Sequence, residues 1–148
     1  MKTLVTYQSK TGFTKKYAEW ISRELSCEMK TVSELKPEDI AACDLVIHGG
    51  WIMGGMINGL NKIREMKPPK LVVFGVGFSH KGEKDEQVVE VNKLGDTPFF
   101  YMEGGMDPKK MGLFSKLIVK MATKKTPMYE DNTDKKYAME LVAAVKTM

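Results

Sequence analysis

Short apolar runs alternate with amphipathic stretches along the chain, and this alternation predicts a repeated strand–helix architecture. Strands are predicted where β-branched and aromatic residues cluster. Residues 71–76 are apolar throughout, as in a strand that is buried on both faces. The predicted strands span residues 3–7, 29–32, 45–47, 71–76 and 98–102, and Gly49-Gly50 is predicted to end the third of them.

Helices are predicted where apolar residues recur every three to four positions. The clearest case begins at Thr14, because Tyr17, Ala18, Ile21 and Leu25 then share one face. The predicted helices span residues 14–25, 58–66, 84–94 and 133–145, with a short helix or loop over 33–42.

Five strand–helix units in sequence predict an α/β fold, a three-layer sandwich with a five-stranded parallel sheet between helices. A chain of 148 residues is of ordinary size for one domain, so residues 1–148 are expected to form a single unit. The stretch from Glu103 to Tyr129 is too long for a simple connection. It is predicted to be a helical insertion, about 103–129, placed before the last helix.

The charge and composition of the chain limit the classes of partner that we expect it to bind. The chain has 23 Lys and Arg against 19 Asp and Glu, a net charge of +4, which is small for a dedicated nucleic-acid binder. No apolar run reaches the roughly 20 residues that span a bilayer, and no signal-peptide pattern follows Met1. A cytoplasmic location and no nucleic-acid partner are therefore expected.

The cysteines and histidines do not form a metal-binding pattern. Cys27 and Cys43 are not part of a Cys-x-x-Cys pair, and His48 and His80 lie in separate segments. Two free buried thiols and no metal site are predicted. His48 is interpreted as a hydrogen-bonded residue at the end of a strand, and His80 as an exposed residue.

The residues that join the first strand to its helix have the chemistry of an anion site. Backbone N–H groups at a helix N-terminus lack partners, and the helix dipole favours negative charge there. Gly12 permits a close backbone approach, and Ser9, Thr11 and Thr14 add hydroxyl donors. A helix cap at Thr14 would explain one hydroxyl but not three and a glycine. The segment therefore predicts phosphate binding.

Residues 9–14, Ser-Lys-Thr-Gly-Phe-Thr, match the [ST]-x-T-G-x-T phosphate loop of flavodoxins, so the chain resembles the flavodoxin family. The resemblance implies strand order 2-1-3-4-5 and FMN bound outside the carboxyl ends of strands 1 and 3. It also implies which residues bind the FMN phosphate. These are Ser9, Lys10, Thr11, Gly12, Phe13 and Thr14.

The resemblance further implies that the loops after the third and fourth strands hold the isoalloxazine ring. Trp51 offers a flat face whose stacking adds roughly 0.5–1.5 kcal/mol beyond burial, although a core or interface role is an equal alternative. Flavodoxins usually place an aromatic residue before a glycine here, whereas this chain has Met53 before Gly54. The predicted ring contacts are Gly50, Trp51, Ile52, Met53, Gly54, Gly77, Phe78 and Ser79.

The predicted insertion contains a basic amphipathic helix, about 109–125, with no acidic residue between Asp107 and Thr126. Such a helix docks on a partner or on an anionic membrane surface, or it packs its apolar face on its own domain, which is the favoured reading. Its position resembles that of the insertion in the flavodoxin-domain family that includes menaquinone-dependent protoporphyrinogen oxidase. The lysines are Lys109, Lys110, Lys116, Lys120, Lys124 and Lys125.

The sequence and the resemblance together predict an FMN-binding redox protein. It is either an electron carrier for a redox partner protein, or an oxidoreductase linked to quinone, NAD(P)H or another small-molecule acceptor. The flavin would carry the chemistry, so no catalytic acid or base is named. A basic chain is expected to make the flavin less reducing than an acidic flavodoxin does. The alternative is a flavin-free module that contacts a partner through the basic helix.

Overall fold

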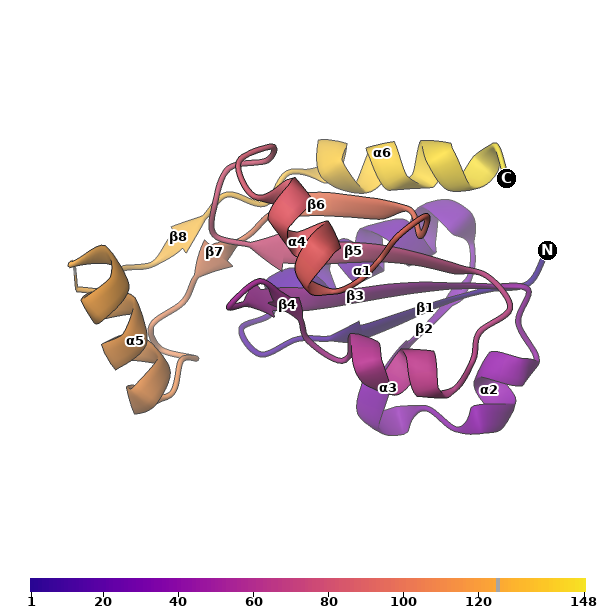
Figure 1. The fold of residues 1–148 in the computed structure, drawn as a ribbon, viewed down its shortest axis with the longest axis horizontal. Coiled ribbons are helices and arrows are strands. Elements are labelled where there is room, and N and C mark those ends of the chain that lie inside the picture. The colour runs from indigo at the N-terminus through magenta and orange to yellow at the C-terminus, as the bar shows by residue number, and fades with distance from the viewer. Residues whose placement is uncertain (125) are drawn as a thin grey trace.

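A computed structural model describes residues 1–124 and 126–148. Its main sheet has the strand order β2-β1-β3-β5-β6, all parallel, and the two-residue strand β4 pairs only with β3 (Figure 1). Without β4, this is the predicted order 2-1-3-4-5. The strands are β1 (Thr3–Gln8), β2 (Glu28–Thr31), β3 (Leu45–Met53), β4 (Met56–Ile57), β5 (Leu71–Gly77) and β6 (Phe99–Glu103).

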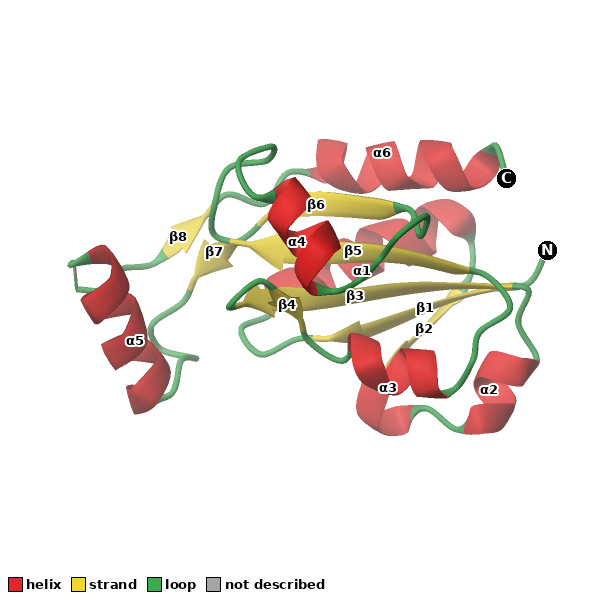
Figure 2. Cartoon of the chain, in the orientation of Figure 1, coloured by secondary structure: helices red, strands yellow, loops and turns green. Residues whose placement is uncertain are grey.

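Helices cover both faces of this sheet, which confirms the three-layer architecture (Figure 2). One face packs against α1 and α6, and the opposite face packs against η1, α2, α3 and α4. Their bounds are α1 (Phe13–Leu25), η1 (Val32–Glu34), α2 (Pro37–Ala41), α3 (Leu60–Glu65), α4 (Asp85–Val91) and α6 (Lys135–Lys146).

The central strands are apolar because helices pack against both faces of the sheet. Side chains alternate between the two faces of a strand, so Val5 and Ile47 pack in the cluster of α1 and α6. Leu4 and Val46, their neighbours in sequence, pack in the opposite cluster with Ile63 of α3. Because both faces are buried, the central strands require apolar residues at successive positions.

The predicted end of the third strand at Gly49-Gly50 is wrong, because β3 continues to Met53 and pairs with β4. A Cβ on Gly49 would lie 1.9 Å from the ring of Phe74, and a Cβ on Gly50 would lie 2.1 Å from the carbonyl oxygen of Asn58. Both glycines therefore make room for neighbours inside the strand. The chain instead reverses at Gly54-Gly55, where φ is +59° and +82°.

The segment after β6 leaves the sheet as a narrow ribbon. Strands β7 (Gly105–Met106) and β8 (Glu130–Asp131) pair antiparallel, and the chain between them contains α5 (Leu113–Thr123), which lies beyond the carboxyl ends of the main sheet (Figure 1). Lys125, which the prediction included in the basic helix, lies outside the described residues. Among the described helices, none combines the length and apolar character needed to cross a membrane.

Candidate functional site

The loop between β1 and α1 presents an open helix N-terminus. Helix α1 begins at Phe13, and its N-cap is Gly12 with φ +97°, a left-handed conformation that favours glycine. The Gly12 N–H donates to Ser9 Oγ at 3.1 Å, which closes the turn. Thr14 is therefore not the cap. It lies in the first turn with only 2% of its surface exposed.

Two hydroxyls of this loop and the N–H groups of the first turn of α1 remain available to a ligand. Within the described chain, no side chain at the N-cap accepts from the first-turn N–H groups, because the cap is Gly12, and the hydroxyls of Thr11 and Thr14 have no hydrogen-bond partner. The first turn also lacks acidic residues. The positive end of the α1 dipole and these free donors favour an anion at the loop.

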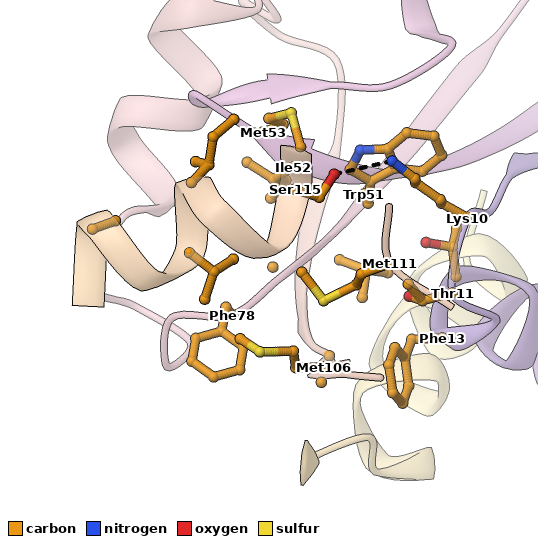
Figure 3. Close-up of a pocket in the computed structure, with 18 of the residues that line it drawn as sticks. Lys10, Thr11, Phe13, Trp51, Ile52, Met53, Phe78, Met106, Met111 and Ser115 are labelled. Atoms are coloured by element: carbon orange, nitrogen blue, oxygen red, sulfur yellow. Dashed lines mark hydrogen bonds between the residues drawn. The ribbon is translucent and has the colours of Figure 1, made fainter. Parts of the chain in front are cut away.

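A cavity of about 290 Å³ begins at this loop and runs along the carboxyl ends of β1, β3 and β5. In the close-up, Lys10, Trp51 and Ser115 gather on one side of it, and Phe78, Met106 and Phe13 on the other (Figure 3). Its walls are mainly apolar. A polar loop at one end of an apolar cavity suits a flat apolar group that carries a phosphate.

Most of the predicted site residues meet at this cavity. Ser9 and Gly12 do not line it; they line a neighbouring recess that shares Lys10 and Thr11 with the cavity. Gly50, Gly54 and Ser79 are not among the described residues that line the cavity. Asn58 fills the space beside Gly50, and Ser79 turns its carbonyl to the Tyr101 hydroxyl at 2.7 Å. The predicted residues that do line the cavity are Lys10, Thr11, Phe13, Thr14, Trp51, Ile52, Met53, Gly77 and Phe78.

Helix α5 and its approach supply a wall that the sequence reading did not assign to the site. Lys10 Nζ donates to Ser115 Oγ at 3.1 Å, which ties the phosphate loop to α5. The amphipathic pattern of the insertion was the signal for this wall, but it did not indicate where the helix would lie. The added wall residues include Met106, Met111, Ser115, Ile118, Val119 and Ala122.

The favoured expectation that the basic helix packs its apolar face on its own domain is wrong. None of the described α5 residues is buried, and Leu113 and Phe114 are 86% and 74% exposed. The helix carries apolar residues on more than one side, so one side lines the cavity and another stays open. Leu117 and Met121 extend the exposed apolar surface.

The two histidines lie outside the cavity. His48 is hydrogen-bonded, as the sequence predicted, but it lies inside β3 and not at the end of a strand. Its ring is buried between Thr6 Oγ1 and the Asn58 carbonyl, at 2.9 Å from each. Burial lowers the pKa of His48 to about 4. His80 is exposed and lies 3.1 Å from a carboxyl oxygen of Glu103, whose hydrogen bond raises the pKa of His80.

Among the residues that the structure describes, no three His, Cys, Asp or Glu side chains lie together in a way that could hold a metal ion. Cys43 is buried and Cys27 half-buried, and both are free thiols. Burial raises the pKa of each thiol, so both are held in their neutral, less reactive form.

Comparisons with known proteins agree with this geometry. The Flavodoxin domain family matches residues 4–135. The flavodoxin-like domain-containing protein BilS of Clostridioides difficile is 35% identical over 97 residues, which are 61% of this chain and 55% of that protein. The matched region thus spans about half of that relative.

Solved structures show the same fold. Oxidised flavodoxin 2 from Bacillus cereus aligns with a TM-score of 0.51 and 20% identity, over 70% of this chain and 84% of that one. A flavodoxin from the domain Archaea aligns with a TM-score of 0.52 and 13% identity, over 99% of both chains. Because the family match covers most of the sequence, this chain belongs to the Flavodoxin domain family, whose cofactor is FMN.

Proposed function

We propose that this chain binds FMN in the cavity at the ends of β1, β3 and β5 and acts as a redox protein. The observation that carries the proposal is that the phosphate loop, Trp51 and Phe78 line one cavity although they come from three separate strand ends. This is the edge of an α/β sheet at which ligands bind. FMN supplies one- and two-electron chemistry when it is bound.

The residues on this edge fit the parts of FMN. Thr11, Thr14 and the first-turn N–H groups would hold the phosphate, since each hydrogen bond to a charged group contributes roughly 1.5–3 kcal/mol. Trp51 would give the ring a stacking face, and Met53 and Phe78 would flank it. Helix α5 would cover the ring and exclude water, which strengthens the electrostatic interactions at the ring.

The charge of the site favours a flavin that is less reducing than in an acidic flavodoxin. Lys10 lines the cavity and would stabilise the negative charge that a reduced flavin carries. For a two-electron couple, each 1.4 kcal/mol of such stabilisation raises the potential by about 30 mV. A redox titration of the FMN-loaded protein checks this, and a two-electron potential as low as that of acidic flavodoxins would contradict it.

We further propose that the protein is an oxidoreductase linked to quinone or NAD(P)H. In its more specific form, the proposal is that the protein is related to the enzymes that oxidise protoporphyrinogen. The apolar wall that α5 adds to the cavity supports an apolar acceptor such as a quinone over a protein-only carrier role, and it gives no support for NAD(P)H. A survey of quinones, porphyrinogens and ferredoxin-type partners with the reduced protein separates these possibilities. Reduction of protein partners alone would favour the carrier.

Flavin extraction tests the central proposal. The protein purified from cells grown with ample riboflavin should be yellow and should release about one FMN per chain. A colourless protein that also fails to quench FMN fluorescence on titration would refute the proposal. That result would favour a flavin-free binding module that contacts its partner through α5.

A second proposal concerns α5, whose exposed apolar side lies beside lysines. Phe114 and Leu117 are exposed, and Lys116, Lys120 and Lys124 follow with no acidic residue in the helix. A basic amphipathic helix of this kind suits an anionic lipid surface. We therefore propose peripheral contact at the inner membrane face. We also propose, from the sequence alone, a cytoplasmic location and a single domain over residues 1–148.

Vesicle co-sedimentation tests the membrane contact. The protein should sediment with vesicles that contain phosphatidylglycerol and much less with pure phosphatidylcholine. Phe114→Ser should reduce binding, while Val91→Ser, at an exposed apolar residue of α4, should not. Equal recovery of wild type and Phe114→Ser from anionic vesicles would contradict the proposal.

A further inference from the structure

The loop between β5 and α4, residues 78–84, supplies Phe78 to the wall of the cavity proposed for FMN (Figure 3). The Phe78 side chain is 49% exposed, so packing against the rest of the protein does not by itself fix the ring. The position of Phe78 therefore depends on how the loop is held.

The backbone on both sides of Phe78 is hydrogen-bonded to the end of β6. The Gly104 N–H, directly after β6, donates to the carbonyl of Gly77 at 2.8 Å. The Tyr101 hydroxyl, on β6, donates to the carbonyl of Ser79 at 2.7 Å. The loop is thus attached to the sheet immediately before and after the residue that reaches the cavity.

Glu103, the last residue of β6, holds the next two residues of the loop through its side chain. One carboxyl oxygen lies 3.1 Å from His80 Nδ1, and the other accepts from the Lys81 N–H at 3.4 Å. The Tyr137 hydroxyl of α6 donates to that second oxygen as well. The hydrogen bonds from Tyr137 and His80 lower the pKa of Glu103, so the carboxylate is ionised at neutral pH and its hydrogen bonds are charge-assisted.

The position of Glu103 is itself fixed by two helices. Its carbonyl accepts from the hydroxyl of Tyr17, a fully buried residue of α1, and its carboxylate accepts from Tyr137 of α6. The Glu103 side chain is only 16% exposed, so the loop and α6 take the place of most of its solvent. Glu103 is therefore fixed relative to the sheet, and residues 80 and 81 are fixed relative to Glu103.

We propose that Glu103 is a positioning residue of the FMN cavity: its carboxylate holds the loop after β5 and thereby keeps Phe78 in the cavity wall. The inference rests on the proposed function, because a bound flavin is the ligand that Phe78 would contact. Without the carboxylate the loop occupies other arrangements, and the affinity for the flavin ring falls in proportion to the share of molecules in which Phe78 is in place.

Riboflavin binding, measured by fluorescence quenching, tests the inference because riboflavin has the flavin ring without the phosphate. Glu103→Gln keeps the size of the side chain and removes its charge, and it should weaken riboflavin about threefold or more. FMN should weaken by the same factor. In a Phe78→Ala background, Glu103→Gln should change riboflavin affinity by less than about 1.5-fold, because the loop no longer brings a ring to the cavity.

The matched control is Glu24→Gln, which removes the same charge and breaks an exposed ion pair with Lys135 of α6, 3.2 Å long. It should leave riboflavin affinity unchanged. The inference is overturned if Glu103→Gln and Glu24→Gln bind riboflavin equally well. It is also overturned if Glu103→Gln weakens riboflavin by the same factor with and without Phe78, since that result indicates a general loss of structure.

A second variant, His80→Gln, tests the same contact from the loop. Its side chain is 77% exposed, so the substitution leaves the core intact. At pH 6 the raised pKa of His80 keeps the wild-type imidazole protonated, and the variant should weaken riboflavin about twofold, as expected for one exposed ion pair. An unchanged affinity, or an equal loss in the Phe78→Ala background, would contradict the inference even if Glu103→Gln did not fold.

Amide hydrogen exchange of the flavin-free protein separates this inference from the proposed function. Peptides that cover residues 78–83 should exchange faster in Glu103→Gln than in the wild type or in Glu24→Gln, because the loop opens more often. If flavin binds and this exchange is unchanged, the inference alone fails. If neither FMN nor riboflavin binds to the wild type, the proposed function fails, and the role of Glu103 at a flavin site fails with it.

Discussion

Acidification should destabilise this protein over a pH range set by the buried imidazole of His48. The side chain is fully buried, with Thr6 Oγ1 and the Asn58 carbonyl each 2.9 Å from a ring nitrogen. A carbonyl only accepts, so Nε2–H donates to Asn58, and Nδ1 accepts from the Thr6 hydroxyl. The site therefore accommodates the neutral ring, and a proton on Nδ1 would bring an uncompensated charge into the core.

The sign and size of this loss of stability follow from the pKa of His48. Burial lowers the pKa of His48 from 6.5 to about 4, so between these values the unfolded chain binds more protons than the folded one. The stability that the neutral, buried His48 contributes is thus fully present above pH 6.5, and this contribution is lost as the pH falls toward 4. The whole shift corresponds to about 3 kcal/mol. Roughly 2 kcal/mol of this should be lost between pH 7.5 and pH 5.

Urea denaturation followed by far-ultraviolet circular dichroism at pH 7.5, 6.5, 5.5 and 5 measures this loss. The range stops at pH 5 because carboxylates such as Glu103, whose pKa is lowered by the Tyr137 hydroxyl and by His80, contribute at lower pH. His80 is the only other histidine, and its raised pKa acts in the opposite direction. The variant His80→Gln should therefore keep the full loss. A free energy of unfolding that stays constant from pH 7.5 to pH 5 in both proteins would refute the reasoning.

Two further predictions concern the phosphate loop and β3. The double variant Thr11→Ala/Thr14→Ala should lower FMN affinity at least tenfold, because two donors to the phosphate are lost, while riboflavin affinity should stay within about twofold. Equal losses for both ligands in fluorescence titrations would place the phosphate elsewhere. Gly50→Ala should cost about 2 kcal/mol or more of unfolding free energy, because its Cβ would lie 2.1 Å from the Asn58 carbonyl oxygen. Gly112→Ala, with no described atom within 4 Å of its Cβ, should leave the thermal midpoint nearly unchanged.

The sequence predicted those features that depend on neighbours in the chain. Apolar runs predicted the central strands because a strand covered on both faces needs apolar side chains at successive positions. The anion site could be predicted from the sequence because residues 9–14 are contiguous, so the loop, its glycine and its hydroxyls form one local unit. The strand order followed from the family resemblance of that loop rather than from the periodicity.

Contacts between distant segments decided the features that the sequence missed. The glycines of β3 look like a strand end, but they make room for Phe74 and Asn58 from other parts of the chain. The hydrogen bond from Lys10 to Ser115 joins residues 105 positions apart and makes α5 a wall of the cavity.

The tertiary structure also decided which charges meet. Lys15, Lys62 and Lys110 have no common pattern along the sequence, and they form a cationic recess only because α1, α3 and the approach to α5 converge on the phosphate loop. Hydrophobic periodicity and contiguous motifs report the local conformation and which side of an element is apolar. They carry no information on which surfaces meet in space, because that is set by packing across the whole chain.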